Sequence, residues 1–215
     1  MSIPIIDLFA GPGGLGEGFS ALRQPGSTEK LFKIGLSVEM DRFAHQTLEL
    51  RSFFRYFPDN GIPQEYYDYL AGNNMTREAL FAAYPEAAEH AKNEALQAKL
   101  GTDTNRILAR IRRALANNPR HWILIGGPPC QAYSTAGRAR LKAEHAKKKT
   151  NFEEDPRHLL YQEYLKIIAR FGPPIFVMEN VRGIELPPFL VPSPSSVFTA
   201  FPSRFLLFGV GFRRG

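Results

Sequence analysis

The chain has 215 residues, of which 44% are hydrophobic and 22% are charged. These values are typical of a folded globular protein of one large or two small domains, and they exclude a disordered or fibrous chain. Lysine and arginine outnumber aspartate and glutamate by 27 to 21, which gives a net charge of +6 and suits a polyanionic partner.

The single cysteine, Cys130, excludes an internal disulfide framework. No apolar run approaches the length of a membrane span, so we expect no membrane partner. The N-terminus lacks a basic region followed by an apolar stretch, which is the mark of a secretory signal. We therefore expect an intracellular, cytoplasmic protein.

The first predicted unit is a strand, a glycine-rich loop and a helix. An apolar, β-branched run at 3–9 leads into the loop, and a helix-compatible stretch follows at 17–22. A second strand at 32–38 leads into an amphipathic stretch at 42–54. This alternation predicts an α/β protein with a Rossmann-like, doubly wound, mostly parallel sheet.

The rest of the chain divides into an insertion, a second run of strands and helices, and a tail. Residues 57–100 are predicted to form a helical insertion or elaborated crossover, with a helical part at 76–100 broken near Pro85. Further elements are expected as a helix at 104–116, a strand at 122–125, a helix at 159–171 and a strand at 174–178. Residues 1–185 are thus predicted to form one domain.

The tail, residues 186–215, shows no clear period. It is rich in proline, phenylalanine and serine, and no acidic residue follows Glu185. We assign it no element and no function, and we expect the fold to be incomplete at its C-terminus.

The loop after the first strand carries a nucleotide-binding pattern. Gly11, Gly13 and Gly16 satisfy G-x-G-x-x-G, and Glu39 lies at the right distance to bind ribose hydroxyls. The spacing alone permits a nicotinamide or flavin enzyme, or a glycine turn that binds nothing. Asp7 differs from a dinucleotide site, because an acid stands where apolar residues are usual. It could orient the loop or lie near the charged amino-acid end of a cofactor such as S-adenosylmethionine.

Two reactive side chains follow the later strands. Cys130 comes after Gly-Gly-Pro-Pro at a strand end, where a stiff backbone would hold its thiol at the edge of the sheet. A thiolate there could add to an electron-poor ring; the alternative is a buried small hydrophobe. Glu179 closes the next apolar strand and is either an acid that donates or shares a proton, or a cap.

Four motifs in order resemble those of the cytosine-C5 DNA methyltransferases. They are residues 6–14, Glu39, residues 127–134 and residues 179–181, and the resemblance covers roughly 3–184 apart from the insertion. It implies transfer of a methyl group from S-adenosyl-L-methionine to C5 of cytosine in duplex DNA, leaving S-adenosyl-L-homocysteine. It also implies a role in a restriction-modification type of system.

The resemblance assigns residues to the reaction. Cys130 would add to C6 of the cytosine, and Glu179 would contact the flipped base, with Asn180 shaping its turn. Arg157 would lie near the base, and Gln131 and Ser134 would follow the nucleophile. The implied cofactor-binding residues are Asp7, Phe9, Ala10, Gly11, Gly13, Gly14, Glu39, Met40, Pro128 and Leu160.

A run of cations follows the nucleophile and is called the basic loop below. A solvated charge run is one reading, and closure on DNA phosphates is the reading that its position favours. The basic loop consists of Arg138, Arg140, Lys142, Lys147, Lys148 and Lys149.

The chain departs from the family at several positions. Trp122 stands where the family usually has an acid, and residues 101–103 only weakly match the pair that reaches the adenine. The family's target-recognition region and C-terminal motifs are not recognisable after Ile184. A truncated gene, a frame disruption near Glu185, or half of a split enzyme completed by a second chain would each account for this.

Three other functions remain open. The same thiolate chemistry serves cytosine-C5 methylation of tRNA. A non-catalytic S-adenosylmethionine-binding module would not need a recognition region. A dinucleotide oxidoreductase is disfavoured, because it would leave Cys130 and Glu179 without a role.

Overall fold

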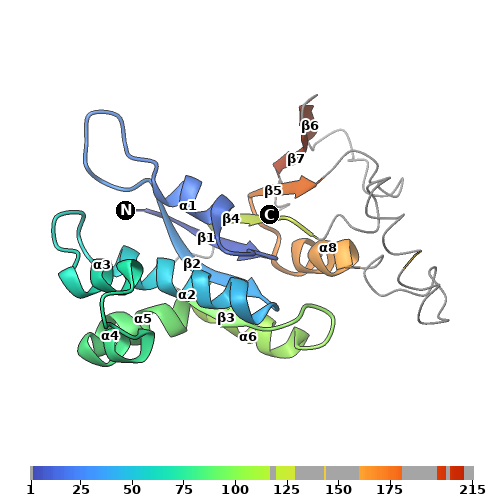
Figure 1. The fold of residues 1–215 in the computed structure, drawn as a ribbon. Helices are drawn as coiled ribbons and strands as arrows, with labels where there is room; N and C mark the ends of the chain where they lie inside the picture. The colour runs from blue at the N-terminus through green and yellow to red at the C-terminus, as the bar shows by residue number, and fades with distance from the viewer. Residues whose placement is uncertain are drawn as a thin grey trace.

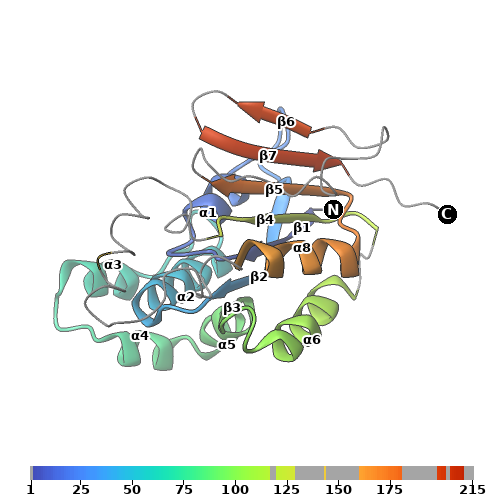
Figure 2. The same ribbon diagram turned by 90° about the vertical axis from the view of Figure 1, so that its right-hand side faces the viewer.

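The computed structural model describes residues 2–116, 120–128, 143, 160–180, 198–201 and 204–210, with the backbone alone described at 180 and in the last two ranges. The described strands form one sheet in the order β3-β2-β1-β4-β5-β7-β6 (Figures 1 and 2). The parallel strands are β1 (Ile3–Leu8), β2 (Phe32–Glu39), β3 (Ala95–Gln97), β4 (Ile123–Gly126) and β5 (Ile175–Asn180). β7 (Arg204–Val210) runs antiparallel to β5 and to β6 (Phe198–Phe201).

Helices cover both faces of the sheet. On one face, α6 (Thr104–Leu115) and α8 (Leu160–Phe171) pack on the largest apolar cluster, and Figure 2 shows α8 in front of the central strands with α6 below it, next to β3. On the other face, α1 (Gly14–Ser20) packs beside β1 and β4, and α2 (Arg42–Tyr56) packs over β2 and β3. This arrangement is a doubly wound α/β fold, as predicted.

Three short helices form a separate layer on α2. They are α3 (Gln64–Ala71), α4 (Arg77–Ala83) and α5 (Pro85–Glu94), and they surround the buried ring of Phe53 with their own apolar cluster. The break predicted near Pro85 is present, because α4 ends at Ala83 and proline opens α5. α3 lies within the predicted helical insertion, in a stretch rich in tyrosine, aspartate, asparagine and glycine.

The helical segment expected at 76–100 ends earlier than predicted. Residues Ala95–Gln97 form β3, which pairs in parallel with the end of β2 through Ser37, Val38 and Glu39. The expectation of helix to residue 100 is therefore wrong. The strand is too short for a period-2 pattern, and its Ala-Leu-Gln sequence suits a helix equally well.

The tail contains structure that the sequence pattern had not shown. β7 pairs along the whole of β5, so that Leu206 lies opposite Glu179 and Phe205 lies opposite Asn180. β5, which carries Glu179, is thereby an inner strand of the sheet. A domain boundary at residue 185 stays a prediction.

An irregularity in β2 decides which side chains face which helices. The pairing of β1 and β2 shifts by one residue at Ile5, so that Gly35 is the extra residue. Ile34 consequently packs on the α1 face, whereas Leu36 and Val38 pack on the α6–α8 face. Glu39 then leaves the strand on the side of the glycine-rich loop. Within the described ranges, no helix is long and apolar enough to cross a membrane.

Candidate functional site

A small pocket lies at the carboxyl ends of the parallel strands. Its volume is about 140 Å³, and segments that follow β1, β2, β3 and β4, together with the first residue of α8, form its walls. Open α/β sheets bind ligands at this edge. The lining residues are Phe9, Val38, Glu39, Met40, Ala98, Lys99, Leu100, Gly127 and Leu160.

Glu39 is held rigidly at this pocket by three main-chain amides. Its Oε2 accepts a hydrogen bond from the Gly11 amide at 2.7 Å. Its Oε1 accepts from the amides of Met40 at 2.8 Å and Asp41 at 2.7 Å. Because hydrogen bonds to a charged acceptor are strong, the carboxylate is preorganised to accept further donors from a ligand.

The chain between β1 and α1 adopts left-handed backbone conformations. The φ angle is 57° at Phe9, 55° at Gly11 and 90° at Gly13, which caps α1. A Cβ on Gly13 would lie 2.8 Å from Leu48 Cδ1, so glycine is required there for space as well as for φ. A phenylalanine at positive φ is costly, and such outliers are concentrated at binding sites. Phe9 lines the pocket, which agrees with that pattern.

The loop after β3 supplies a wall that the sequence pattern had not indicated. Ala98, Lys99 and Leu100 line the pocket, and the Ala98 amide donates to the Glu39 carbonyl oxygen at 3.0 Å. Asp103 closes this loop, because its Oδ2 accepts from the Lys99 amide at 2.9 Å. The sequence signal that could have located this wall is the short loop that precedes the predicted helix at 104–116.

Asp7 is buried beneath the glycine-rich loop and does not line the pocket. It is 1% exposed, and neither of its carboxyl oxygens has a hydrogen-bond partner among the described residues. A Cβ on Gly16 of α1 would lie 3.1 Å from its Oδ2. Burial raises the pKa of Asp7 to about 8; Glu39 and Glu94 also raise it, whereas Arg55 lowers it. The raised pKa favours the protonated, neutral form of Asp7 at pH 7.

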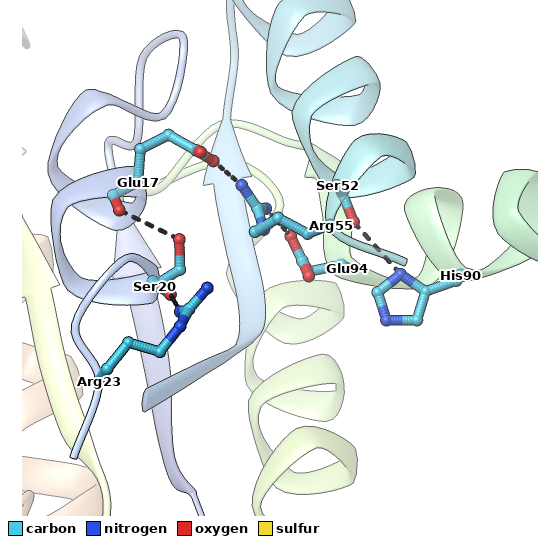
Figure 3. A network of polar contacts seen from close by, with 7 residues as sticks. All are labelled: Glu17, Ser20, Arg23, Ser52, Arg55, His90 and Glu94. Carbon is cyan, nitrogen blue, oxygen red and sulfur yellow. Dashed lines mark hydrogen bonds and ion pairs between the residues drawn. The ribbon is translucent and has the colours of Figure 1, made fainter. Parts of the chain in front are cut away.

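A charge network links α1, α2 and α5 behind this loop (Figure 3). Arg55 of α2 pairs with Glu17 of α1 and with Glu94 of α5, and Figure 3 shows its guanidinium between the two carboxylates. Ser52 Oγ lies 3.4 Å from His90 Nδ1 in the same cluster. Because Arg55 and Glu94 are largely buried, the network ties the helical layer to the helix that carries the glycine-rich loop.

The ends of β4 and β5 lie side by side above Tyr164. Gly126 pairs with Met178, and a Cβ on Gly127 would lie 3.6 Å from the Glu179 carbonyl oxygen. The segment that leads toward Cys130 thus starts beside Glu179. The fully buried Tyr164 donates its hydroxyl proton to the Val177 carbonyl at 3.0 Å and lies 3.3 Å from that of Leu124.

The structure tests the placement of only some of the predicted site residues. Phe9, Glu39, Met40 and Leu160 share the pocket, and Gly11 is bonded to Glu39. Ala10, Gly13 and Gly14 shape the loop beside it, and Pro128 follows Gly127 after β4. Outside the described residues lie Cys130, Gln131, Ser134, Arg157 and, except for position 143, the whole segment 129–159 that contains the basic loop; the side chain of Asn180 is also not described.

Fold and pocket define a Rossmann-like α/β protein with a pocket at the carboxyl edge of its sheet. Residues 90–188 match the family of C-5 cytosine-specific DNA methylases. The chain belongs to the cytosine-C5 DNA methyltransferase family and represents part of its catalytic portion.

Two relatives and one solved structure illustrate the similarity. The type II methyltransferase M.Bpa9945I of Bacillus paralicheniformis is 34% identical over 196 residues, which are 84% of this chain and 41% of that protein. The type II methyltransferase M1.HphI of Haemophilus parahaemolyticus is 28% identical over 86% of this chain and 34% of its own length. A structure described as a DNA modification methyltransferase of an E. coli prophage matches 98% of this chain and 47% of its own, with a TM-score of 0.49 and 20% identity. The chain therefore spans less than half the length of these proteins.

Proposed function

We propose that this chain binds S-adenosyl-L-methionine and carries the catalytic residues for methylation of cytosine C5 in duplex DNA. The observation that carries the proposal is Glu39, whose carboxylate is fixed by three amides at a pocket with apolar walls. The names of the two relatives, both type II methyltransferases, support a role in DNA modification within a restriction-modification system. We expect it to act in the cytoplasm, on DNA.

The pocket fits the adenosine part of this cofactor. A carboxylate accepts hydrogen bonds from two ribose hydroxyls, and Phe9, Met40 and Leu160 offer flat or flexible apolar contacts for a purine. The volume of about 140 Å³ is below the roughly 300–1,000 Å³ of sites that enclose whole ligands. The described walls therefore form one side of the proposed site, around the base and the ribose.

The reactive residues are assigned from the family. Bound S-adenosylmethionine supplies an electrophilic methyl group. The Cys130 thiolate would add to C6 of the flipped cytosine, which makes C5 nucleophilic. C5 would then take the methyl group, leaving S-adenosylhomocysteine, and the thiolate would leave as the C5 proton is lost to water. Glu179 holds a proton at N3 of the base and offsets the charge that develops there. Arg157 lies near the base in this assignment.

DNA binding is assigned to the segment that follows the nucleophile. Gln131, Ser134 and the basic loop would contact phosphates and the vacated base position. The nearby strand ends support this location, because the described chain before this segment, at Gly127, lies at the edge that carries Glu39 and Glu179. A second chain that supplies sequence recognition remains part of the proposal.

Binding of S-adenosylhomocysteine, measured by calorimetry, tests the cofactor assignment. We expect saturable binding at a stoichiometry of one, and no detectable binding would overturn it. The nucleophile is tested with duplex DNA that contains 5-fluorocytosine, on which the enzyme should form a denaturant-resistant adduct. An adduct that survives Cys130→Ser would refute the role of Cys130.

A non-catalytic cofactor-binding fragment, or one half of a split enzyme, is a second candidate. The observation that favours it is the pocket around Glu39, which would serve a cofactor-binding module without any catalytic residue. Methyl transfer by this chain alone would exclude it, whereas cofactor binding without transfer would support it. Comparing transfer to duplex DNA and to tRNA separates DNA methylation from the tRNA alternative.

A further inference from the structure

Helix α6 carries four arginines and no acidic residue. Its core side consists of Ile107, Leu108, Ile111 and Leu115, all buried against the sheet and α8. The arginines project from the remaining surface, with Arg106, Arg112 and Arg113 exposed and Arg110 half-buried. They are called the α6 arginines below. The exposed side of a surface helix normally carries both acidic and basic residues, so a helix with four arginines and no acid is unusual.

The charges of the α6 arginines are not neutralised by carboxylates. Arg106 donates to the Gln97 carbonyl at 3.2 Å, and Arg110 donates to the carbonyls of Asn93 and, at 3.4 Å, Lys92. These acceptors carry no net charge. None of the four forms an ion pair with a carboxylate in the part of the chain that the structure describes.

Three of the α6 arginines, Arg106, Arg110 and Arg113, lie close enough for their positive charges to repel one another. Partial burial lowers the pKa of Arg110, and the positive charges of Arg113 and Arg106 lower it further, while Glu89 raises it. On the neighbouring side, the Arg112 guanidinium lies 6.0 Å from the ring centre of Phe171, at the end of α8. Holding cations so close, with no carboxylate ion-paired to them among the described residues, costs free energy that a bound anion would offset.

The row of α6 arginines begins close to the pocket of the proposed site. Arg106, Arg110 and Arg113 are spaced i, i+4 and i+7, so they follow one side of the helix over about 10 Å. Arg106 contacts Gln97, which ends β3 directly before the pocket residues Ala98 and Lys99. The row of arginines thus begins at the carboxyl edge of the sheet and runs down its flank. Figure 2 shows α6 along that side, next to α8.

Two of the α6 arginines have a structural role that does not explain the other two. Arg106 bonds to the Gln97 carbonyl at the end of β3, and Arg110 bonds to the Asn93 carbonyl in the last turn of α5. Arg112 and Arg113 lie in the last turn of α6, where cations complement the helix dipole. That interaction is worth only about 0.3–1 kcal/mol per exposed charge, and it does not require two adjacent arginines.

We propose that the α6 arginines bind the phosphate backbone of duplex DNA outside the target site, without regard to sequence. Arginine suits this task, because its planar fork donates two parallel hydrogen bonds to a phosphate. A duplex that lies along this flank would be retained near the edge of the sheet while the target base is sought. The α6 arginines are different residues from those of the basic loop, and their proposed role requires no catalysis.

The salt dependence of DNA binding tests the proposal. The anisotropy of a short fluorescent duplex of arbitrary sequence would be titrated with the full chain at several sodium chloride concentrations. Each phosphate contact contributes about 0.9 to the slope of log K against log salt, so Arg112→Gln/Arg113→Gln should reduce that slope by about 1.8. Arg112→Lys/Arg113→Lys, which keeps both charges, should retain it.

A matched control removes two cations elsewhere. Arg23 and Lys30 pair through an isolated antiparallel β-bridge, and the Arg23 guanidinium forms an ion pair with Asp59 at 2.8 Å. Arg23→Gln/Lys30→Gln should leave the slope unchanged. An unchanged slope in the Arg112/Arg113 variant, or an equal loss in the control, would overturn the proposal.

Two further measurements distinguish DNA binding from unfolding of the variants and from attraction to any polyanion. Thermal melting followed by circular dichroism must show that all variants are folded. Fluorescent polyglutamate binding with the same arginine dependence as DNA would overturn the assignment to nucleic acid.

The cofactor provides an independent check on the same variants. Calorimetry with S-adenosylhomocysteine should give the same affinity in every variant, because the α6 arginines do not line the pocket. If no variant binds S-adenosylhomocysteine but the Arg112/Arg113 variant still shows the smaller salt slope, the proposed function is rejected. The proposal that the α6 arginines bind DNA is then retained.

Discussion

The Gly11 amide and the Glu39 carboxylate are joined by a 2.7 Å hydrogen bond across 28 residues of sequence. This bond fixes the glycine-rich loop after β1 to the end of β2, and the Ala98 amide adds the segment after β3 through the Glu39 carbonyl. One residue thereby organises three walls of the pocket. Its carboxylate combines a structural role with the proposed recognition of ribose.

Replacing Glu39 should weaken cofactor binding more than it weakens the fold. In Glu39→Gln one amide loses its acceptor and the negative charge disappears, so we expect the Kd for S-adenosylhomocysteine to rise about tenfold to a hundredfold. Calorimetry measures this. The control is Asp41→Asn, because Asp41 caps α2 by accepting from the amides of Phe43 and Ala44 and lies outside the pocket lining. Equal losses of affinity in both variants would contradict a specific role for Glu39.

Two neighbouring glycines should differ in their tolerance of alanine. Gly13→Ala would place a Cβ 2.8 Å from Leu48 Cδ1 at a φ of 90°, so we expect a loss of about 2 kcal/mol or more in the free energy of unfolding. A Cβ on Gly14, which lies in helix α1, would meet no atom within 4 Å. Gly14→Ala should therefore leave the free energy of unfolding unchanged or raise it slightly. Urea unfolding compares them, and similar values would contradict the described loop geometry.

Asp7 should make stability depend on pH with an unusual sign. Its pKa is raised to about 8 from 3.8, so between these values the folded state holds a proton that the unfolded state has released. The free energy of unfolding should therefore fall as the pH rises from about 4 to about 8, by at most about 1.4 kcal/mol per pH unit from this group. Asp7→Asn removes the titration, so the variant should gain stability relative to the native chain as the pH rises. Parallel profiles in urea unfolding from pH 5 to 8 would reject a buried neutral acid.

The hydroxyl of Tyr164 should contribute to stability although it lies in an apolar cluster. Tyr164→Phe removes the donor that reaches the Val177 carbonyl and leaves a buried acceptor with one partner fewer, which costs about 1–2 kcal/mol. Tyr67→Phe is the control, because Tyr67 is 46% exposed on α3; its change should be below about 0.5 kcal/mol. Chemical unfolding measures both. A loss no larger than the control's would show that the contact is unimportant.

Local sequence determined the elements whose patterns are long and regular. The apolar runs of β1, β2, β4 and β5 and the amphipathic periods of α2, α6 and α8 were all predicted close to their observed bounds. The same patterns placed Phe9, Glu39 and Glu179 at strand ends, which is why these candidate positions could be named before any contact was known. Each signal lies within a window of about ten residues.

Tertiary structure decided what no local window contains. β3 is a strand because its three residues meet the free edge of β2, and the tail adds β7 because β5 offers an unpaired edge there. The bulge at Gly35 sets the face on which Glu39 emerges, and the loop at 98–100 becomes a pocket wall only through the hydrogen bond between Ala98 and Glu39. Strand edges and buried charges such as Asp7 acquire their properties from residues far away in sequence, since pairing and desolvation depend on what surrounds a group in space.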